Sequence, residues 1–327
     1  MQLTTSLTRA LKVRHPIVLA AMDQVADSRL SQAVAAAGGY AFLGGGYGDE
    51  SWLRRELDIL SPWARTNGLP FGVGFITWSL AKKPELLDIA LSHQPSAVWF
   101  SFGDASAMIP RVKAAGAKAV CQVQSEAMAK AALDAGADVL VAQGSEAGGH
   151  GAIRGTMALV PTLVDLAGAD IPVVAAGGIA DGRGLAAALA LGASGVVLGT
   201  RLYATVEAAG WDTAKQRIVD ASGDDTVRSI VFDISRRNVW PTPFTGRCLS
   251  NDHLRKWLGR EIDLVRDQQS EAGKYDESRA KGDFDRAAVI AGESSGLIHD
   301  IPTVNEVIDR MLVQAVEALG RARALVS

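Results

Sequence analysis

The sequence predicts an α/β protein, a (β/α)8 TIM barrel with a mostly helical cap inserted after its eighth strand. Three observations support this fold class. An alanine-rich helical run, followed by a glycine and then by an apolar strand, recurs along the N-terminal part of the chain. Eight apolar segments have the composition of buried strands. A charged region then ends the repeat, and the total of 327 residues exceeds the ~250 that such a barrel typically needs.

The repeated glycines mark where helices are expected to end. Gly38, Gly116, Gly136 and Gly192 each follow an alanine-rich run and precede an apolar segment. Glycine tolerates the left-handed conformation that terminates many helices and turns the chain into the next element. Helix-then-strand repeats imply βα units and therefore a parallel sheet.

Eight candidate strands follow from this pattern, and eight parallel strands are the number in a (β/α)8 barrel. The candidates span residues 16–21, 40–43, 70–75, 97–101, 118–123, 138–142, 172–176 and 195–198. A doubly wound open sheet is the alternative arrangement of such units. The first βα turn, Ala20-Ala-Met-Asp-Gln-Val25, lacks the GxGxxG pattern of dinucleotide-binding open sheets, which favours the barrel.

The repeat stops after Tyr203, where the composition becomes richer in charge. We expect residues 1–206 and 288–327 to form the barrel. Residues 207–287 are expected to form a helical cap over the barrel mouth.

Two helices are expected in the C-terminal third of the chain. Residues 251–267 carry apolar side chains at helical spacing, which predicts one amphipathic helix. Its apolar face would consist of Leu254, Trp257, Leu258, Ile262 and Val265. Thr303 and Glu306 have the spacing of a capping box and predict the start of a last helix, which returns to pack on the barrel.

The composition argues against several partner classes. A formal net charge of −3 and a pI of about 6.0 give no electrostatic reason to expect nucleic acid or an anionic membrane. Cys121 and Cys248 form no CxxC pattern, so neither a disulfide framework nor a metal site is expected. The N-terminus lacks a signal-peptide pattern, and no apolar run approaches the ~20 residues of a membrane span. We therefore expect a cytoplasmic protein that handles small molecules.

The stretch from Val141 to Gly151 is the first candidate for chemistry. An apolar strand ends there in Gln143, four glycines and the single imidazole of His150. Loops at the carboxyl ends of barrel strands carry active sites, and histidine titrates near neutral pH, so His150 is a candidate general base. A loop histidine that bonds a backbone carbonyl remains the alternative at this point.

Glycines also end the seventh and eighth candidate strands. In barrels these two loops commonly bind phosphate through backbone N–H groups. Gly177 and Gly178 would let the backbone approach an anion, and Gly199 with the Thr200 hydroxyl would supply further donors. Tight turns are the alternative explanation. A phosphate site would imply a phosphorylated substrate or a phosphate-bearing cofactor, and the pattern leaves that choice open.

Three motifs together resemble a known family. They are Ala142-Gln-Gly-Ser-Glu-Ala-Gly-Gly-His-Gly151, Ala175-Ala-Gly-Gly-Ile-Ala-Asp-Gly-Arg183 and Leu198-Gly-Thr-Arg201. The chain thereby resembles the nitronate monooxygenases, formerly called 2-nitropropane dioxygenases. The resemblance extends along the barrel and covers the cap only loosely. The superfamily also includes FMN-dependent enoyl reductases and NADH:quinone reductases.

The resemblance implies bound FMN. Its phosphate would lie on Gly177, Gly178, Gly199 and Thr200. Residues that would contact the flavin ring or ribityl chain by the same analogy are Ala21, Met22, Gln122, Gln143 and Gly148. His150 corresponds to the catalytic histidine of the family, which takes the α-proton of a nitroalkane or pairs with the anionic nitronate.

The implied reaction is oxidation of alkyl nitronates by O2 to a carbonyl compound and nitrite. One alternative is an NAD(P)H-dependent FMN reductase acting on a quinone or an enoyl thioester. Another is a barrel that binds flavin or a phosphorylated ligand without turnover. A homodimer is one expectation for its assembly. Two positions depart from the family pattern, because many relatives have asparagine in place of Gly74 and some have lysine in place of Gln122.

Other polar and aromatic residues are interpreted structurally. Glu146 could orient His150, but a solvated carboxylate or a structural hydrogen bond is the favoured interpretation. Packing is favoured over pocket lining for Trp78 and Trp240, and helix capping accounts for Asp181. The remaining histidines are assigned to the surface or to local hydrogen bonds, and they are His15, His93, His253 and His299.

Overall fold

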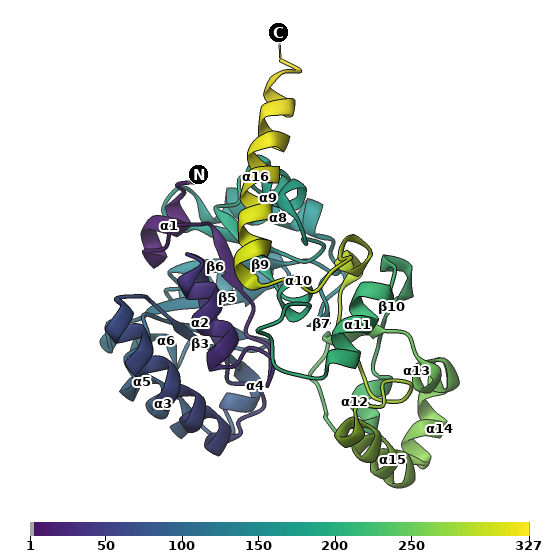
Figure 1. Cartoon of the computed structure of the whole chain (residues 1–327). Coiled ribbons are helices and arrows are strands. Elements are labelled where there is room, and N and C mark those ends of the chain that lie inside the picture. Colours follow the sequence, from purple (N-terminus) through teal and green to yellow (C-terminus); the bar gives the residue numbers. More distant parts are fainter. Residues whose placement is uncertain (1–2, 327) are drawn as a thin grey trace.

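The computed structural model describes residues 3–326, and its centre is a closed barrel of eight parallel strands (Figure 1). The strands follow one another around the barrel in chain order, and Ile17 in the first lies opposite Val196 in the last, which closes the sheet. All eight predicted strands are confirmed. They are β1 (Ile17–Leu19), β2 (Tyr40–Gly44), β3 (Gly72–Ile76), β4 (Ala97–Ser101), β5 (Lys118–Val123), β6 (Val139–Gln143), β8 (Val173–Ala176) and β9 (Gly195–Leu198).

Helices surround this barrel on the outside. The predicted helix-ending glycines are confirmed, because all four have a positive φ, between 78° at Gly116 and 92° at Gly136. The outer helices are α2 (Ser28–Ala36), α3 (Glu50–Asn67), α4 (Thr77–Leu80), α5 (Glu85–Ser92), α6 (Ile109–Ala114), α7 (Glu126–Asp134), α8 (Thr156–Ala167), α9 (Gly182–Ala190) and α10 (Thr200–Tyr203).

The barrel interior is a packed core. The ring of Phe42 lies edge-on to Trp99, with ring centroids 5.0 Å apart. Gly72 makes room for Phe42, because a Cβ at that position would lie 2.5 Å from the phenylalanine ring. The short helix α1 (Ser6–Leu11) contributes Leu7 and Leu11 to the same cluster. Because the interior is filled by side chains, ligands must bind at the barrel ends.

The cap contains a small sheet as well as helices. It comprises α11 (Asp212–Asp220), η1 (Gly223–Asp225), β10 (Thr226–Ser229), α12 (Val231–Ser235), β11 (Thr245–Leu249), α13 (Asp252–Trp257), α14 (Glu261–Arg266) and α15 (Gln268–Lys281). A further strand, β7 (Gly149–Gly151), leaves the barrel and pairs antiparallel with β11, giving the order β10-β11-β7. The sheet that joins the barrel to the cap was not part of the prediction.

The single helix predicted over residues 251–267 is wrong. Gly259 has a φ of 78° and separates α13 from α14. Leu258, Ile262 and Val265 are 47%, 72% and 56% exposed. The second helix instead buries Leu264. A left-handed glycine resets the helical phase, so the face extrapolated across it was not the buried one.

The last helix, α16 (Val304–Arg323), is as predicted. The Thr303 hydroxyl and the Glu306 carboxylate exchange hydrogen bonds with each other's backbone N–H groups in a complete capping box. The helix packs beside α9 and α2, and its C-terminal turns extend beyond the body of the barrel (Figure 1). The side chains on its packed face are Val304, Val307, Ile308, Met311, Leu312 and Ala315.

A second hydrophobic cluster forms the centre of the cap. It includes Ile218, Phe232, Trp257 and Tyr275 and continues to Ile298, which lies between η2 (Glu293–Leu297) and α16. The boundaries at residues 206 and 288 stay a prediction. No helix within residues 3–326 combines the length and the apolar character needed to cross a bilayer.

Candidate active site

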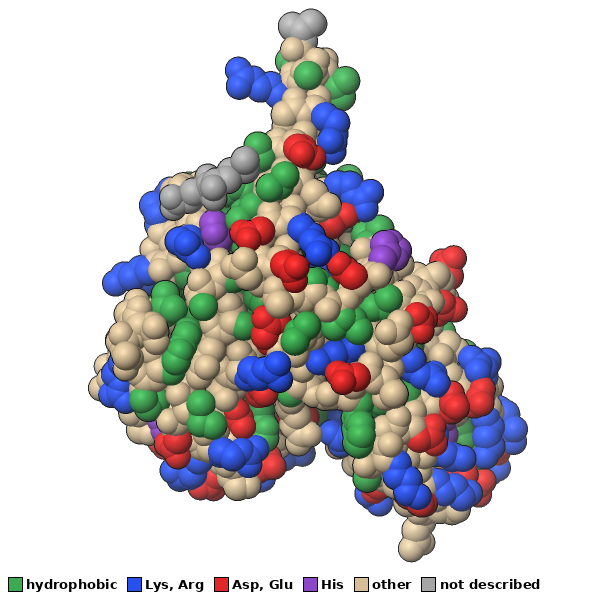
Figure 2. Space-filling view, in the orientation of Figure 1, with side chains coloured by type: hydrophobic (Ala, Val, Ile, Leu, Met, Phe, Trp, Pro, Cys, Tyr) green, Lys and Arg blue, Asp and Glu red, His purple; other side chains and the backbone are tan. Residues whose placement is uncertain are grey.

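A cavity of about 920 Å³ opens at the carboxyl ends of the barrel strands, beneath the cap. In the space-filling view the barrel and the cap form two lobes with an indentation between them (Figure 2). The structure brings every sequence-predicted site residue to the wall of this one cavity. These residues are Ala21, Met22, Gln122, Gln143, Gly148, His150, Gly177, Gly178, Gly199 and Thr200.

One wall of the cavity offers unpaired backbone donors. Within residues 3–326, the N–H groups of Gly177, Gly178, Gly199 and Thr200 have no hydrogen-bond acceptor. Gly177 and Gly178 have φ values of 104° and 74°, which L side chains rarely adopt. The Thr200 Oγ1 accepts the N–H of Gly292 at 3.0 Å, so its own proton is free to be donated. Four unpaired backbone donors at the wall of one cavity suit a phosphate.

The N–H groups at the start of α9 are not available to a ligand, because Asp181 caps that helix. The Asp181 side chain accepts hydrogen bonds from the N–H groups of Arg183 and Gly184 at the start of α9, as the capping interpretation predicted. The amino end of α9 is therefore occupied by its own carboxylate. The donors left for a ligand are those of the two glycine loops.

Hydrogen bonds join three glutamines at the carboxyl ends of β5 and β6. The Oε1 of Gln143 accepts hydrogen bonds from the Nε2 of Gln122 at 2.9 Å and the Nε2 of Gln124 at 2.7 Å. With its carbonyl oxygen occupied twice, the amide N–H2 of Gln143 is left as a donor. Gln122, where some relatives have lysine, therefore orients Gln143 without adding a charge.

The departure at Gly74 has a steric cause. A Cβ at Gly74 would overlap the Cβ of Ala21, which lines the cavity from the loop after β1. Asparagine does not fit there unless Ala21 moves. The small size of Gly74 and that of Ala21 therefore depend on each other in this chain, because a larger side chain at either position would meet the other residue.

His150 is held by a carboxylate that the sequence did not reveal. Its Nε2 lies 3.0 Å from both carboxylate oxygens of Asp233. The two residues are only 8% and 5% exposed. Because an ionised carboxylate only accepts hydrogen bonds, Nε2 carries the proton and donates it. Nδ1 then holds the lone pair, and it has no hydrogen-bond partner among the described residues.

Asp233 reaches His150 through the small sheet. His150 in β7 lies opposite Gly246 in β11, and α12, which carries Asp233, connects β10 to β11. Asp233 stands 83 residues after His150 in a segment without any recognisable motif. No local signal in the sequence could have paired them.

Aromatic rings enclose the imidazole. Trp240 stacks on His150, with ring centroids 3.4 Å apart and planes 6° from parallel. Phe102 approaches both rings edge-on. Trp240 therefore lines the cavity beside the candidate base, where packing alone had been favoured, whereas Trp78 packs edge-on against Trp240.

Burial lowers the pKa of His150, and the hydrogen bond and negative charge of Asp233 oppose that effect. The positive charges of Arg236 and Arg228 add to the lowering. A lowered pKa keeps the imidazole neutral at neutral pH, so its Nδ1 is able to accept a proton.

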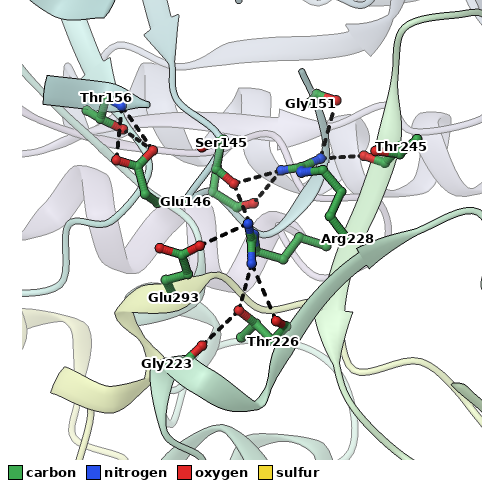
Figure 3. Close-up of polar contacts among 11 residues, drawn as sticks. Ser145, Glu146, Gly151, Thr156, Gly223, Thr226, Arg228, Thr245 and Glu293 are labelled. Carbon is green, nitrogen blue, oxygen red and sulfur yellow. Dashed lines mark hydrogen bonds and ion pairs between the residues drawn. The ribbon is translucent and has the colours of Figure 1, made fainter. Parts of the chain in front are cut away.

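Two arginines of the cap hold the loop that carries His150. The Arg228 guanidinium donates to the carbonyls of Ser145, Ala147, Gly151 and Thr245 (Figure 3). Arg247 donates to the same Ser145 carbonyl at 3.0 Å and pairs with Glu293 at 2.9 Å. Burial lowers the pKa of Arg228 to about 10, which leaves it charged at neutral pH.

Glu146 does not orient His150. Its carboxylate accepts the N–H of Thr156 at 3.0 Å and the Thr156 hydroxyl at 2.9 Å (Figure 3). The Thr156 Oγ1 also lies 3.1 Å from the carbonyl of Gly177. The favoured interpretation, a structural hydrogen bond, is confirmed. The contact links the His150 loop to the glycine loop after β8.

Comparison with known proteins assigns a class to this geometry. Residues 76–314 match the family described as Nitronate monooxygenase. The chain is 36% identical to nitronate monooxygenase npaC of Metarhizium robertsii, over 96% of this chain and 93% of that protein. It is 29% identical to a 5-hydroxy-7a-methyl-1-oxo-octahydro-1H-indene-4-carboxyl-CoA dehydrogenase of Mycobacterium tuberculosis, over 100% of both proteins. The solved structure of FabK from Thermotoga maritima matches with a TM-score of 0.87 at 31% identity, covering 99% of this chain and 100% of that one.

The protein is therefore an oxidoreductase built on a TIM barrel. It belongs to the nitronate monooxygenase family, which confirms the resemblance seen in its sequence motifs. The curated relatives are named as enzymes, which argues against a barrel that only binds a ligand. They include both a monooxygenase and a dehydrogenase, so family membership leaves the particular reaction open.

Proposed function

We propose that this protein uses FMN to oxidise alkyl nitronates, and neutral nitroalkanes after their deprotonation, with O2 to a carbonyl compound and nitrite. The observation that carries the proposal is the pairing of His150 with Asp233 in the same cavity as the four unpaired amides. The unpaired amides suit a phosphate. His150, a buried neutral base in the same cavity, suits a substrate that loses a proton from carbon.

The residues present fit FMN. The N–H groups of Gly177, Gly178, Gly199 and Thr200 would hold the phosphate, because they lack acceptors and two of the glycines adopt positive φ. Other residues that line the same cavity would contact the rest of the cofactor, and they are Ala21, Met22, Gln122, Gln143 and Gly148. When bound, the flavin supplies the electron chemistry between nitronate and O2.

His150 would supply the proton chemistry. Asp233 fixes the tautomer with the proton on Nε2, so Nδ1 takes the α-proton from the carbon beside the nitro group. The resulting imidazolium, flanked by Asp233, balances the negative charge of the nitronate. Trp240 stacks on the imidazole and holds its ring plane.

Three measurements test the proposal. Purified protein should show flavin absorption bands and should consume O2 when given a nitronate. His150→Asn should lose activity on neutral nitroalkanes by about 10²- to 10⁴-fold, the usual contribution of a general base. His299→Asn is the matched control, because His299 is exposed and lies outside the cavity lining. Absence of O2 uptake with every nitronate tested contradicts the proposal.

An enzyme that exchanges electrons between NAD(P)H and a quinone or a CoA thioester is the second candidate, because the Mycobacterium tuberculosis relative, aligned over 100% of both proteins, is named a CoA dehydrogenase. In the direction of a reductase, NAD(P)H would reduce the flavin, and a quinone or an enoyl thioester would accept the electrons. Anaerobic mixing with NADH separates the two. Rapid bleaching of the flavin bands favours the reductase, and an unchanged spectrum favours the oxidase.

A further inference from the structure

The carboxylate of Asp233 depends for its position on the backbone that carries it. Both of its oxygens contact Nε2 of His150, and within residues 3–326 the side chain makes no other hydrogen bond and no other ion pair. No second side chain therefore orients this carboxylate. Whatever holds the backbone of α12 decides where Asp233 stands relative to His150.

Helix α12 is too short to hold its own position. It spans 5 residues, and no side chain caps its amino end. Isolated helices of this length are not stable in water, so α12 takes its place from contacts with the rest of the cap. Residues two apart on a helix point to nearly opposite sides, because each residue turns the chain by about 100°. Asp233 faces His150, and Ser235 faces α13.

A buried histidine contacts α12 on that second side. Nε2 of His253, in α13, lies 2.7 Å from Oγ of Ser235, and the two residues are 3% and 0% exposed. This hydrogen bond forms with either tautomer of the imidazole, because a hydroxyl both donates and accepts. The ring of His253 also stacks on Phe232, with ring centroids 5.9 Å apart. His253 therefore contacts α12 at residues 232 and 235, on either side of Asp233 in the sequence.

Helix α15 completes the support of α12. Nδ1 of His253 lies 3.8 Å from Oε2 of Glu271, a buried carboxylate that also pairs with Lys274 at 2.9 Å. Gln268 makes a direct contact, since its Nε2 donates to the carbonyl of Ile234 at 2.8 Å. Helix α12 is thus tied to α13 through His253 and to α15 through Gln268.

This polar cluster does not itself meet a substrate. Ser235, His253 and Glu271 have the residue types of a hydrolase triad, but none of the three lines the cavity. A nucleophile has to reach its substrate, and these side chains are enclosed in the cap. The consequence of the cluster for the active site must pass through α12.

His150 is held independently of α12. Strand β7, which contains it, pairs with β11, and Trp240 stacks on its imidazole. Loss of the contact between Ser235 and His253 would therefore displace Asp233 and leave the imidazole in place.

We propose that Ser235 and His253 are positioning residues, which hold α12 so that the Asp233 carboxylate stays on Nε2 of His150. Nδ1 of His150 then keeps its lone pair for the proton of the substrate. When the contact is lost, the carboxylate withdraws and the proton is no longer confined to Nε2. The role of His150 as a base rests on the proposed function, whereas its tautomer does not.

Ser235→Ala tests the contact by removing one oxygen atom. It should lower kcat for nitroethane by about 10-fold or more and change KM by less than about 3-fold, because misplacing a catalytic group by 1 Å costs up to about 10²-fold. Oxidation of ethyl nitronate, which needs no base, should change by less than about 3-fold. His253→Leu should behave alike, and His253→Gln, whose amide can still bond Ser235, should restore most of the loss. The matched control is Ser278→Ala, a buried cap serine bonded to Asp283.

A double variant separates positioning from a general loss of stability. In an Asp233→Asn background, Ser235→Ala should lower kcat for nitroethane by less than about 2-fold further, because it acts only through the carboxylate that is already gone. Losses that multiply in the double variant would show that Ser235 acts independently of Asp233, and they would overturn the inference.

Nitrogen NMR of the holoprotein, labelled with nitrogen-15 histidine, reads the tautomer without turnover. The signals of His150 are those that disappear in His150→Asn. In wild type and Ser278→Ala they should show the proton on Nε2, and in Ser235→Ala the shifts of Nε2 and Nδ1 should move toward each other as the second tautomer becomes populated.

The NMR result distinguishes this inference from the proposed reaction. If neither nitroalkanes nor nitronates are oxidised but the shifts of His150 change in Ser235→Ala, the proposed function fails and the positioning inference stands. Identical His150 shifts in wild type and Ser235→Ala overturn the inference. If Ser235→Ala does not fold, His253→Leu and His253→Gln provide the same comparison, and equal shifts in those two variants overturn it.

Discussion

Replacing Asp233 by asparagine tests the role of the carboxylate with almost no change in shape. Nε2 of His150 donates to both oxygens of Asp233 at 3.0 Å, and both side chains are buried. An asparagine amide N–H2 would instead donate to Nε2 and move the ring proton to Nδ1. The lone pair would then face the amide and not the cavity. Losing the opposing charge of Asp233 also lowers the pKa of His150 further.

The expected loss follows from what His150 would do. A positioned general base contributes about 10²- to 10⁴-fold, which corresponds to roughly 3–5 kcal/mol of transition-state stabilisation. Asp233→Asn should therefore reduce kcat/KM for a neutral nitroalkane by that factor. A preformed nitronate has already lost its proton, so its oxidation should fall by less than about 10-fold.

Oxygen uptake with nitroethane and with ethyl nitronate, at several pH values, provides the assay. In wild type, the lowered pKa of His150 keeps the base neutral below the ordinary histidine range, so activity on nitroethane should decline only as pH falls through that lowered value. Asp263→Asn, an exposed cap carboxylate, is the control. Equal losses on both substrates, or no loss on nitroethane, would refute the assignment of Asp233 as the residue that positions the base.

Three further predictions concern stability. Arg228→Ala removes hydrogen bonds to four carbonyls and should lower the free energy of unfolding, measured by urea titration, by about 3 kcal/mol or more. Arg237 is exposed, so Arg237→Ala should lower the same free energy by less than about 1 kcal/mol. Gly182→Ala should lower the free energy of unfolding by about 1–3 kcal/mol, because its Cβ would overlap the Met311 carbonyl where α9 meets α16. Gly320→Ala, with open space around it, should be neutral or stabilising. Equal melting temperatures for the two variants would contradict this packing. Burial lowers the pKa of His253 to about 4, so the unfolded state takes up more protons between about pH 6.5 and 4, and stability should fall as pH drops through that window. Unfolding free energies of His253→Gln should show a shallower fall over the same range, and an identical pH profile would count against a neutral buried His253.

Much of the barrel could be predicted because its signals are local. Each strand is a short apolar run, and the four helices for which an end was predicted are followed by a glycine whose backbone conformation only glycine adopts easily. The glycine loops that follow β8 and β9 were predicted for the same reason, since Gly177 and Gly199 directly follow their strands. Features that depend on a few consecutive residues could therefore be predicted from the sequence.

The cap shows where local signals end. Strand β7 consists of Gly149, His150 and Gly151, which have little intrinsic preference for a strand, and it forms because β11 pairs with it. Gly259 divides the single helix that was expected over residues 251–267 into α13 and α14. Asp233 had no motif around it. Its pairing with His150 is a contact between distant segments, which periodicity and spacing do not record.

The pairing of β7 with β11 also divides the active site between two bodies. The four unpaired amides proposed to hold phosphate belong to the barrel. His150 lies in β7, which pairs with β11 of the small sheet; that sheet carries Arg228 and Arg247, and the helix that carries Asp233, α12, connects β10 to β11. A cap that swings outward must either break those hydrogen bonds or take His150 with it. The proton acceptor would then leave the cofactor site each time the cap opens, and deprotonation would be confined to the closed enzyme. Under the proposed mechanism, this attachment would couple proton abstraction by His150 to closure of the cap.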